Sequence, residues 1–136
     1  MANKNIEEIE GIGPVTGEKL RKAGVKDTNS LLEKGGTQGG RKALADASGL
    51  SDSQVLKFVN MADLFRIKGV GAEYAELLEC AGVDTVKELA MRNAANLAHK
   101  LAELNLEKKL TRKVPTLSQV EAWVKQAGSL PAKVRH

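Results

Sequence analysis

The sequence predicts an all-α protein made of two similar five-helix units, at residues 1–63 and 64–136. The composition favours helices, because Ala, Leu, Lys and Glu are frequent and only 3% of the 136 residues are aromatic. Apolar residues also recur at helical spacing, as in Val55, Phe58 and Val59. The same order of motifs then returns in the second half, which indicates an internal repeat. No Gly, Pro or Ser run separates the halves, so we expect the two units to pack together.

The repeat rests on residues that match at a nearly constant offset. Five positions match at an offset of 58, namely Gly11, Gly13, Leu20, Gly24 and Val25 with Gly69, Gly71, Leu78, Gly82 and Val83. Asp27-Thr28 and Leu44-Ala45 then match Asp84-Thr85 and Leu101-Ala102 at an offset of 57. Ser53-Gln54-Val55 matches Ser118-Gln119-Val120 at an offset of 65, so the second copy carries about eight extra residues. We place this insertion between Asn105 and Pro115.

Each unit is expected to contain five short helices in the same order. Phe58 and Trp123 are expected in the core, and the chain ends, residues 1–5 and 129–136, are expected to be loose. A first short helix precedes a glycine turn, and Pro14, Gly24 and Gly82 suit the limits of the second helix. The second helix is predicted at about 14–22 in the first unit and 72–80 in the second, and the third begins near Thr28 and Thr85. The fourth is predicted at about 40–47 and 94–104. The fifth begins at capping boxes that open with Ser51 and Thr116.

The glycine turns Gly11-Ile12-Gly13 and Gly69-Val70-Gly71 suggest a binding chemistry. Glycine permits the positive φ of a tight turn, with the middle apolar residue tucked beneath it. The first N–H groups of the following helix can then donate to a phosphate at the positive end of the helix dipole. The expected donors are Gly13, Val15 and Thr16 in the first unit and Gly71, Ala72 and Glu73 in the second. In both copies the small residue that follows, Gly17 or Ala75, is expected to let a second helix cross closely. The alternative to phosphate binding is that each turn only reverses the chain.

Basic residues beside the turns make the first one the better candidate. Lys19, Arg21 and Lys22 follow the first turn, and Arg66 and Lys68 precede the second. However, three carboxylates on the helix after the second turn would repel a phosphate backbone, so that helix is expected to pack on protein; they belong to Glu73, Glu76 and Glu79.

A second basic pair opens a helix after the glycine-rich residues 35–40. This stretch lacks the Gly-Lys-Ser/Thr ending of a Walker motif, and no strand precedes it. Arg41 and Lys42 nevertheless lie where the helix dipole disfavours cations. Either a nearby carboxylate or a bound phosphate is expected to offset that charge.

The insertion carries a run of basic residues, Lys108, Lys109, Arg112 and Lys113, with Lys100 and His99 nearby. Residues 1–63 hold 9 Lys and Arg against 9 Asp and Glu, whereas residues 64–136 hold 12 against 8. All of the net charge of +4 therefore lies in the second half. Such a run is usually a solvated face, but the fold does not require an insertion, so the run is also a candidate anion-binding surface.

The sequence gives no support for catalysis or for a cofactor. No cluster of residues has the spacing of metal ligands, and the two histidines are far apart. Cys80, among apolar neighbours, is expected to be a small buried residue. Neither a signal peptide nor a membrane span is predicted, and a single cysteine suits the cytoplasm.

The turn Gly-Ile-Gly-Pro at residues 11–14 resembles the helix-hairpin-helix motif in one of its most specific spellings. Together with the duplicated unit and residues 40–45 and 59–71, it makes nearly the whole chain resemble a bacterial tandem helix-hairpin-helix family. That family has no settled function and is similar to the helix-three-turn-helix part of flap endonucleases. The resemblance implies the fold but not nuclease activity, because the catalytic carboxylate domain is missing. Tandem units of this kind also serve as rigid protein-binding blocks.

We therefore predict a non-enzymatic protein that binds DNA without sequence preference and uses no small-molecule substrate. Backbone amides and basic side chains would contact phosphates. The alternative is a protein-interaction or scaffold module with the same fold. The candidate binding residues are Gly11, Ile12, Gly13, Val15, Thr16, Lys19, Lys22, Arg41, Lys42, Arg66, Lys68, Gly69, Gly71, Lys108, Lys109, Arg112 and Lys113.

Overall fold

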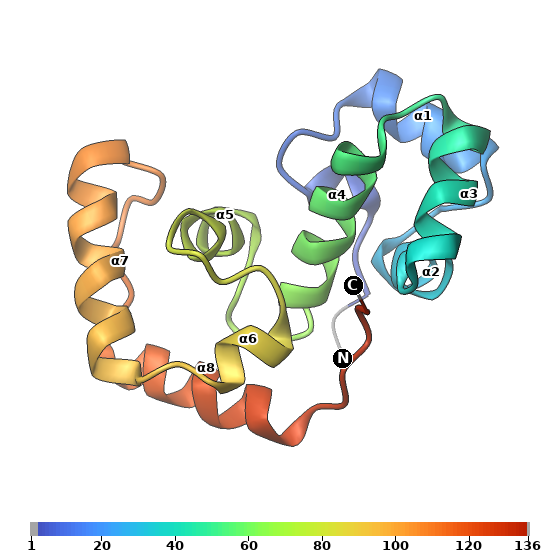
Figure 1. The fold of residues 1–136 in the computed structure, drawn as a ribbon. Helices are drawn as coiled ribbons and strands as arrows, with labels where there is room; N and C mark the ends of the chain where they lie inside the picture. The colour runs from blue at the N-terminus through green and yellow to red at the C-terminus, as the bar shows by residue number, and fades with distance from the viewer. Residues whose placement is uncertain (1–2, 136) are drawn as a thin grey trace. The chain divides into compact units, whose positions relative to one another are not determined.

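The computed structural model describes residues 3–135, and this part of the chain is all-α, as the sequence predicts. It contains no β-strand, only an isolated antiparallel bridge between Asn5 and Asp27. The elements are a short 3-10 helix η1 (Ile6–Glu8) and the α-helices α1 (Pro14–Lys22), α2 (Thr28–Gly35), α3 (Gln38–Ser48), α4 (Asp52–Leu64), α5 (Ala72–Cys80), α6 (Val86–Ala90), α7 (Ala94–Lys108) and α8 (Leu117–Ser129) (Figure 1).

The helices form two compact units. The N-unit comprises the described residues up to Asp63 together with residues 133–135, and the C-unit comprises Leu64–Ala132. The C-unit has no separate helix ahead of Gly69, because α4 runs to Leu64 and residues 65–69 form turns. Its helices are therefore α5 to α8, and the proposed internal repeat stays a prediction.

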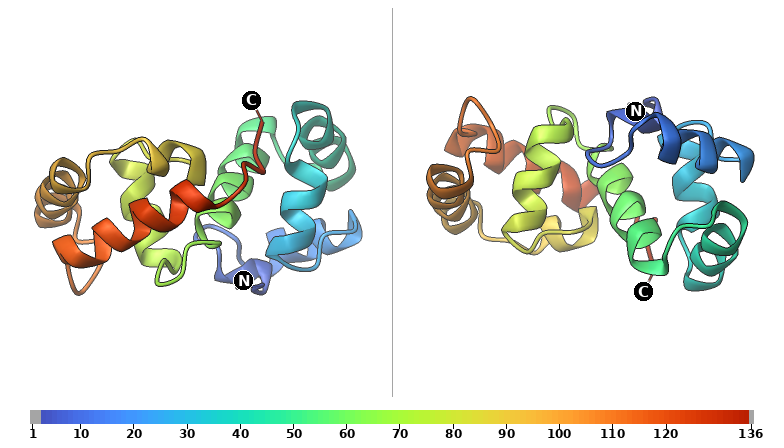
Figure 2. Two further views of the ribbon diagram at one scale, coloured as in Figure 1. Left: turned by 90° about the horizontal axis from the view of Figure 1, so that it is seen from below. Right: turned by 90° about the horizontal axis from the view of Figure 1, so that it is seen from above.

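In the N-unit, α3 packs against both α1 and α2 (Figure 2). The core is aliphatic, with Leu20 of α1, Leu31 of α2 and Val55 of α4 fully buried. Phe58 of α4 is also buried, as expected. At the end of α2, a Cβ on Gly35 would clash with the Val59 side chain, so glycine allows α4 to approach.

In the C-unit, α8 packs against α6 and α7, and α5 packs against α7 (Figures 1 and 2). Leu77 and Leu78 of α5 and Leu101 of α7 are fully buried. Trp123 of α8 is buried beside the ring of Tyr74, with centroids 5.2 Å apart. Burial of Trp123 confirms that it is a core residue.

The bounds of α1 and α5 agree with the sequence prediction, and both ends have the same backbone geometry. Gly24 and Gly82 follow these helices with φ of +92° and +87°. The amides of the next residues, Val25 and Val83, then donate to the carbonyls of Leu20 and Leu78, each at 2.9 Å. In each helix this bond satisfies a carbonyl group of the last turn and fixes where the helix stops.

Other boundaries differ for local reasons. The helix predicted to begin near Gly40 begins at Gln38, because the Thr37 hydroxyl accepts the Gly40 amide. Helix α7 continues to Lys108, beyond its predicted end near residue 104, so the helix takes up part of the stretch in which the sequence predicts an insertion. Cys80, at the end of α5, is exposed, which corrects the expectation that it is buried.

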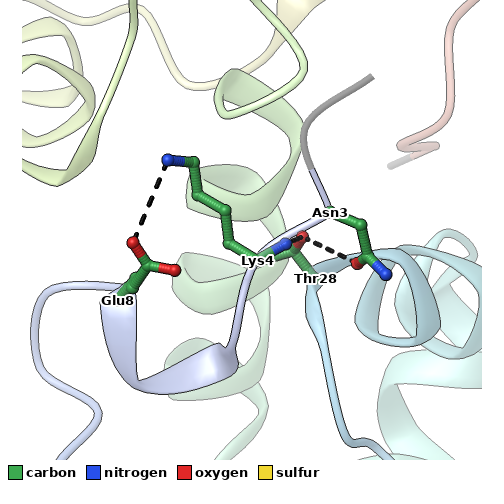
Figure 3. A network of polar contacts seen from close by, with 4 residues as sticks. All are labelled: Asn3, Lys4, Glu8 and Thr28. Atoms are coloured by element: carbon green, nitrogen blue, oxygen red, sulfur yellow. Dashed lines mark hydrogen bonds and ion pairs between the residues drawn. The ribbon is translucent and has the colours of Figure 1, made fainter.

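The described residues at both ends of the chain are anchored, contrary to the sequence prediction. Figure 3 shows that Asn3 and Lys4 lie against Thr28. The Lys4 amide donates to the Thr28 hydroxyl at 3.0 Å, and the Thr28 amide donates to the Lys4 carbonyl at 2.8 Å. The ammonium of Lys4 also lies 3.9 Å from the Glu8 carboxylate (Figure 3). The expectation for residues 1, 2 and 136 falls outside the described residues.

No helix in residues 3–135 combines the length and the apolar character that crossing a bilayer requires.

Candidate nucleic-acid interface

The first glycine turn is a tight reversal supported from below by an aromatic ring. Gly11 has φ of +94°, which L side chains rarely adopt. Ile12 is buried, and its amide donates to the Ile9 carbonyl at 3.1 Å. A Cβ on Gly11 would lie 3.4 Å from the ring of Phe58. Gly13 then has an extended backbone, with φ −92° and ψ −171°, and directly precedes α1.

The second turn follows the same backbone course within the C-unit. Gly69 has φ of +93°, and the Val70 amide donates to the Ile67 carbonyl at 3.1 Å. A Cβ on Gly69 would lie 3.3 Å from Trp123 Nε1. Gly71 is extended, with φ −101° and ψ −168°, and directly precedes α5.

The two glycines that precede α1 and α5 occupy positions where a capping side chain is normally favoured. Within residues 3–135, the other six α-helices each have a side chain that accepts a first-turn amide. No side chain does so for α1 or α5. Moreover, a Cβ on Gly13 or Gly71 would meet nothing within 4 Å. Neither the backbone conformation nor packing therefore requires glycine at these two positions. The capping residues of the other helices are Asp27, Thr37, Ser51, Thr85, Asn93 and Thr116.

The small residue of the first motif, Gly17, is buried and faces the short helix η1, which packs against α1. A Cβ on Gly17 would lie 2.7 Å from a carboxylate oxygen of Glu7, which is bound to the guanidinium of Arg21. The hydrogen bond from Arg21, and then a bond from the Glu7 backbone, hold the pKa of Glu7 below its ordinary value of 4.5. Arg21 is thus committed to Glu7, and the helix that lies close to Gly17 is η1, which meets it through the Glu7 side chain.

The lysines that follow the first turn differ in their surroundings. Lys19 is exposed, and Lys22 is exposed but lies 3.3 Å from the Glu18 carboxylate one turn earlier. An exposed pair of this kind is weak, so it leaves Lys22 able to exchange its partner. Helix α1 has no acidic residue in its first turn, whereas α5 has Glu73 there. The first turn is therefore the less repulsive of the two for an anion.

Arg41 is not available to a ligand, which corrects its prediction as a binding residue. Its side chain is buried, and the guanidinium donates to the carbonyls of Gly35 at 3.0 Å and Arg135 at 2.7 Å. The charge is thus offset by backbone carbonyls instead of by the carboxylate or phosphate that the sequence suggested. Lys42, the next residue, is exposed.

The prediction of Arg66 as a binding residue is also corrected, because its side chain is buried and hydrogen-bonded. It is buried within the C-unit, and both terminal nitrogens donate to the carbonyl of Pro131, at 2.9 and 2.8 Å. Lys68 is exposed, and its backbone amide donates to the side chain of Gln126 at 2.8 Å. Of the basic residues before the second turn, only Lys68 presents its charged group to solvent.

The basic loop, which we define as residues 108–113, is held in shape by buried polar residues. Helix α7 ends when Lys109 adopts a left-handed conformation, with φ of +51°. The side chain of Asn105 then accepts the Thr111 amide at 2.9 Å and donates to the Thr111 carbonyl at 3.1 Å. We call this pair of bonds the clasp. Beyond it, the Lys113 carbonyl accepts the hydroxyls of Thr111 at 2.9 Å and Tyr74 at 3.0 Å.

The clasp separates the inner and outer residues of the basic loop. Asn105 and Thr111 are buried. The four basic side chains of the loop are exposed, and none forms an ion pair with a residue of the described chain; they are Lys108, Lys109, Arg112 and Lys113. Because Tyr74 belongs to the first turn of α5, the loop lies beside the helix that follows the second glycine turn. Sequence reasoning missed Asn105, Thr111 and Tyr74, since a contact between polar side chains six or more residues apart leaves no periodic pattern.

The described residues contain no group of three or more His, Cys, Asp or Glu side chains that could hold a metal ion. Their arrangement is that of an all-α protein with two uncapped glycine turns and one ordered basic loop. Residues 10–130 match the family described as Domain of unknown function (DUF4332), and the chain belongs to that family. No solved structure matches the chain.

Proposed function

We propose that this protein binds DNA without sequence preference and without catalysing a reaction. The observation that carries the proposal is the presence of glycine at both uncapped helix starts, Gly13 and Gly71. A capping side chain would stabilise each helix, and neither position requires glycine for packing or for its φ. A glycine there leaves the first-turn amides open to an outside acceptor, such as a phosphate oxygen.

The basic loop supplies a long-range electrostatic attraction for phosphates, which backbone amides do not provide. Hydrogen bonds from amides are short-range and directional, whereas clustered cations dominate non-specific affinity for the phosphate backbone. The clasp fixes the backbone of this loop, and four exposed basic side chains lie on it: Lys108, Lys109, Arg112 and Lys113. We therefore assign affinity mainly to the basic loop and orientation to the first turn, where α1 begins without an acidic residue.

Resemblance to the helix-hairpin-helix motif and to the helix-three-turn-helix part of flap endonucleases supports the same proposal. The motif residues are Gly11, Ile12 and Gly13, and Gly69, Val70 and Gly71. Contacts of backbone amides with phosphates carry no sequence information, so the expected binding is independent of base sequence.

The test is a titration with labelled duplex and single-stranded DNA of two unrelated sequences at two salt concentrations. Binding through phosphates releases counterions, so affinity should fall steeply as salt rises and should not depend on sequence. Absence of binding even at low salt would contradict the proposal.

An alternative use as a protein-interaction module has one observation in its favour. Val15 and Leu106 are 69% and 80% exposed, and each lies close in sequence to a candidate DNA-contacting element. Exposed apolar side chains suit a protein partner more than a phosphate backbone. A complex formed through them should depend only weakly on salt, which separates the two functions.

A further inference from the structure

The short segment Lys133, Val134 and Arg135 is docked on the N-unit, although it follows the last helix of the C-unit in the chain. The Arg135 amide donates to the Gly36 carbonyl at 2.7 Å. The Arg41 guanidinium donates to the Arg135 carbonyl, also at 2.7 Å. Both polar groups of the Arg135 backbone are therefore recognised by the end of α2 and the start of α3.

The surface that receives this segment depends on three features. Gly36 gives it room, because a Cβ there would lie 2.7 Å from the Lys133 carbonyl oxygen. Arg41 is held in place by its second bond, to the Gly35 carbonyl at 3.0 Å. Val134 is only 6% exposed, whereas the side chains of Lys133 and Arg135 are exposed. Recognition thus uses backbone groups and one buried apolar side chain.

We propose that this surface is a peptide-recognition site, filled in this structure by residues 133–135 of the same chain. The partner that fits it is the same extended segment from a second copy of the protein. Recognition of an extended backbone by hydrogen bonds, with specificity from one side-chain pocket, is a general mode of peptide binding. The segment of the same chain competes strongly, because its tether gives it an effective concentration in the millimolar range.

The experiment keeps the full chain and releases the segment by Val134→Asp. The probe is a fluorescent peptide with the sequence of residues 129–136, and its anisotropy is followed as protein is added. The Val134→Asp protein should bind the peptide saturably, at least about tenfold more tightly than the parent, because the site is vacated. The matched control is Ala132→Asp, which adds the same charge at an exposed neighbour and should behave as the parent does. A peptide that itself carries Val134→Asp should not bind.

Two results would overturn the proposal. One is a Val134→Asp protein that has the parent's helical content but shows no saturable binding of the native peptide. The other is equal binding of the native and the aspartate-containing peptides, which would indicate charge attraction alone. Hydrogen exchange on the parent gives a measurement that needs no variant, since the Arg135 amide should be protected. Free exchange of that amide would show that the segment is not docked.

Discussion

At the scale of single residues, the two glycines of each turn have different roles. Gly11 has a positive φ and supports the reversal, so a side chain there is strained. Gly13 has an ordinary extended backbone and open space around its Cα. The sequence motif treats the two glycines alike, whereas in the structure only the first one has a backbone conformation that favours glycine.

This difference predicts opposite effects of Gly13→Asp on stability and on binding. An aspartate can cap α1, so the free energy of unfolding should rise by roughly a few tenths of a kcal/mol. The same carboxylate would cover the first-turn amides and repel a phosphate, so DNA affinity should fall. Urea denaturation and a DNA titration measure the two effects.

The matched control for this variant is Gly39→Asp, which adds the same charge in the first turn of α3. Gly39 is exposed and has equally open space around it. If both variants weaken DNA binding equally, the loss at Gly13 reflects net charge, and the first turn is not a phosphate site.

Because Asp27 caps α2 as a carboxylate, the stability of the folded protein should depend on acid pH through this residue. The Ser30 amide, and then the side chains of Asn3 and Ser30, lower the pKa of Asp27 below its ordinary value of 3.8. The carboxylate therefore stabilises the folded state above that value, and the contribution is lost as pH falls through the lowered pKa. Asp27→Asn, which can still cap, should keep most of the stability at pH 7 and flatten the loss below about pH 4.

Urea denaturation at neutral and acid pH measures this flattening. The control is Asp46→Asn, because Asp46 is exposed on α3. An Asp27→Asn protein whose stability falls with pH as steeply as the parent's would show that the cap contributes nothing to acid sensitivity.

At the scale of elements, the basic loop depends on the clasp. Asn105→Ala would leave the amide and carbonyl of buried Thr111 without their partners, at a cost of about 1–3 kcal/mol. All four basic side chains would remain, but the loop would be less ordered. DNA affinity should therefore fall less than it does when the charges themselves are removed.

The measurements are denaturation, DNA titration and hydrogen exchange at the Thr111 amide, which should lose protection. Asn96→Ala is the control, since Asn96 lies on the same helix and its side chain is exposed. Stability and binding equal to those of the Asn96→Ala protein would mean that the clasp does not shape the loop.

At the scale of the whole molecule, the distribution of charge decides the salt dependence. Changing Lys108, Lys109, Arg112 and Lys113 together to Ala should lower DNA affinity greatly. The slope of log affinity against log salt should shrink by about 0.9 for each phosphate that the variant no longer neutralises. Titrations at several salt concentrations give that slope directly.

A protein with Lys26, Lys57, Lys87 and Lys125 changed to Ala carries the same net charge and is the matched control, because all four lie outside the candidate interface. Equal slopes for the two quadruple variants would make the basic loop an ordinary solvated face. The protein-interaction alternative would then be the better description of the function.

Local chemistry made much of this fold predictable from the sequence. Helical composition predicted the all-α class, and Pro14, Gly24 and Gly82 predicted the bounds of α1 and α5, because caps and breakers act over a single turn. Aromatic residues at helical spacing predicted the burial of Phe58 and Trp123. The motif also predicted a positive φ within each glycine pair, and the structure places it at Gly11 and Gly69 but not at Gly13 or Gly71.

Only the tertiary structure decided which basic side chains are exposed to solvent and which are buried. Arg41 and Arg66 have the same formal charge as Lys109, but packing buries them against the carbonyls of Arg135 and Pro131. These partners lie 94 and 65 residues away in the chain, so no local pattern relates them. The physical reason is that a cap is satisfied within a few residues, whereas a buried guanidinium takes whatever acceptors folding brings beside it.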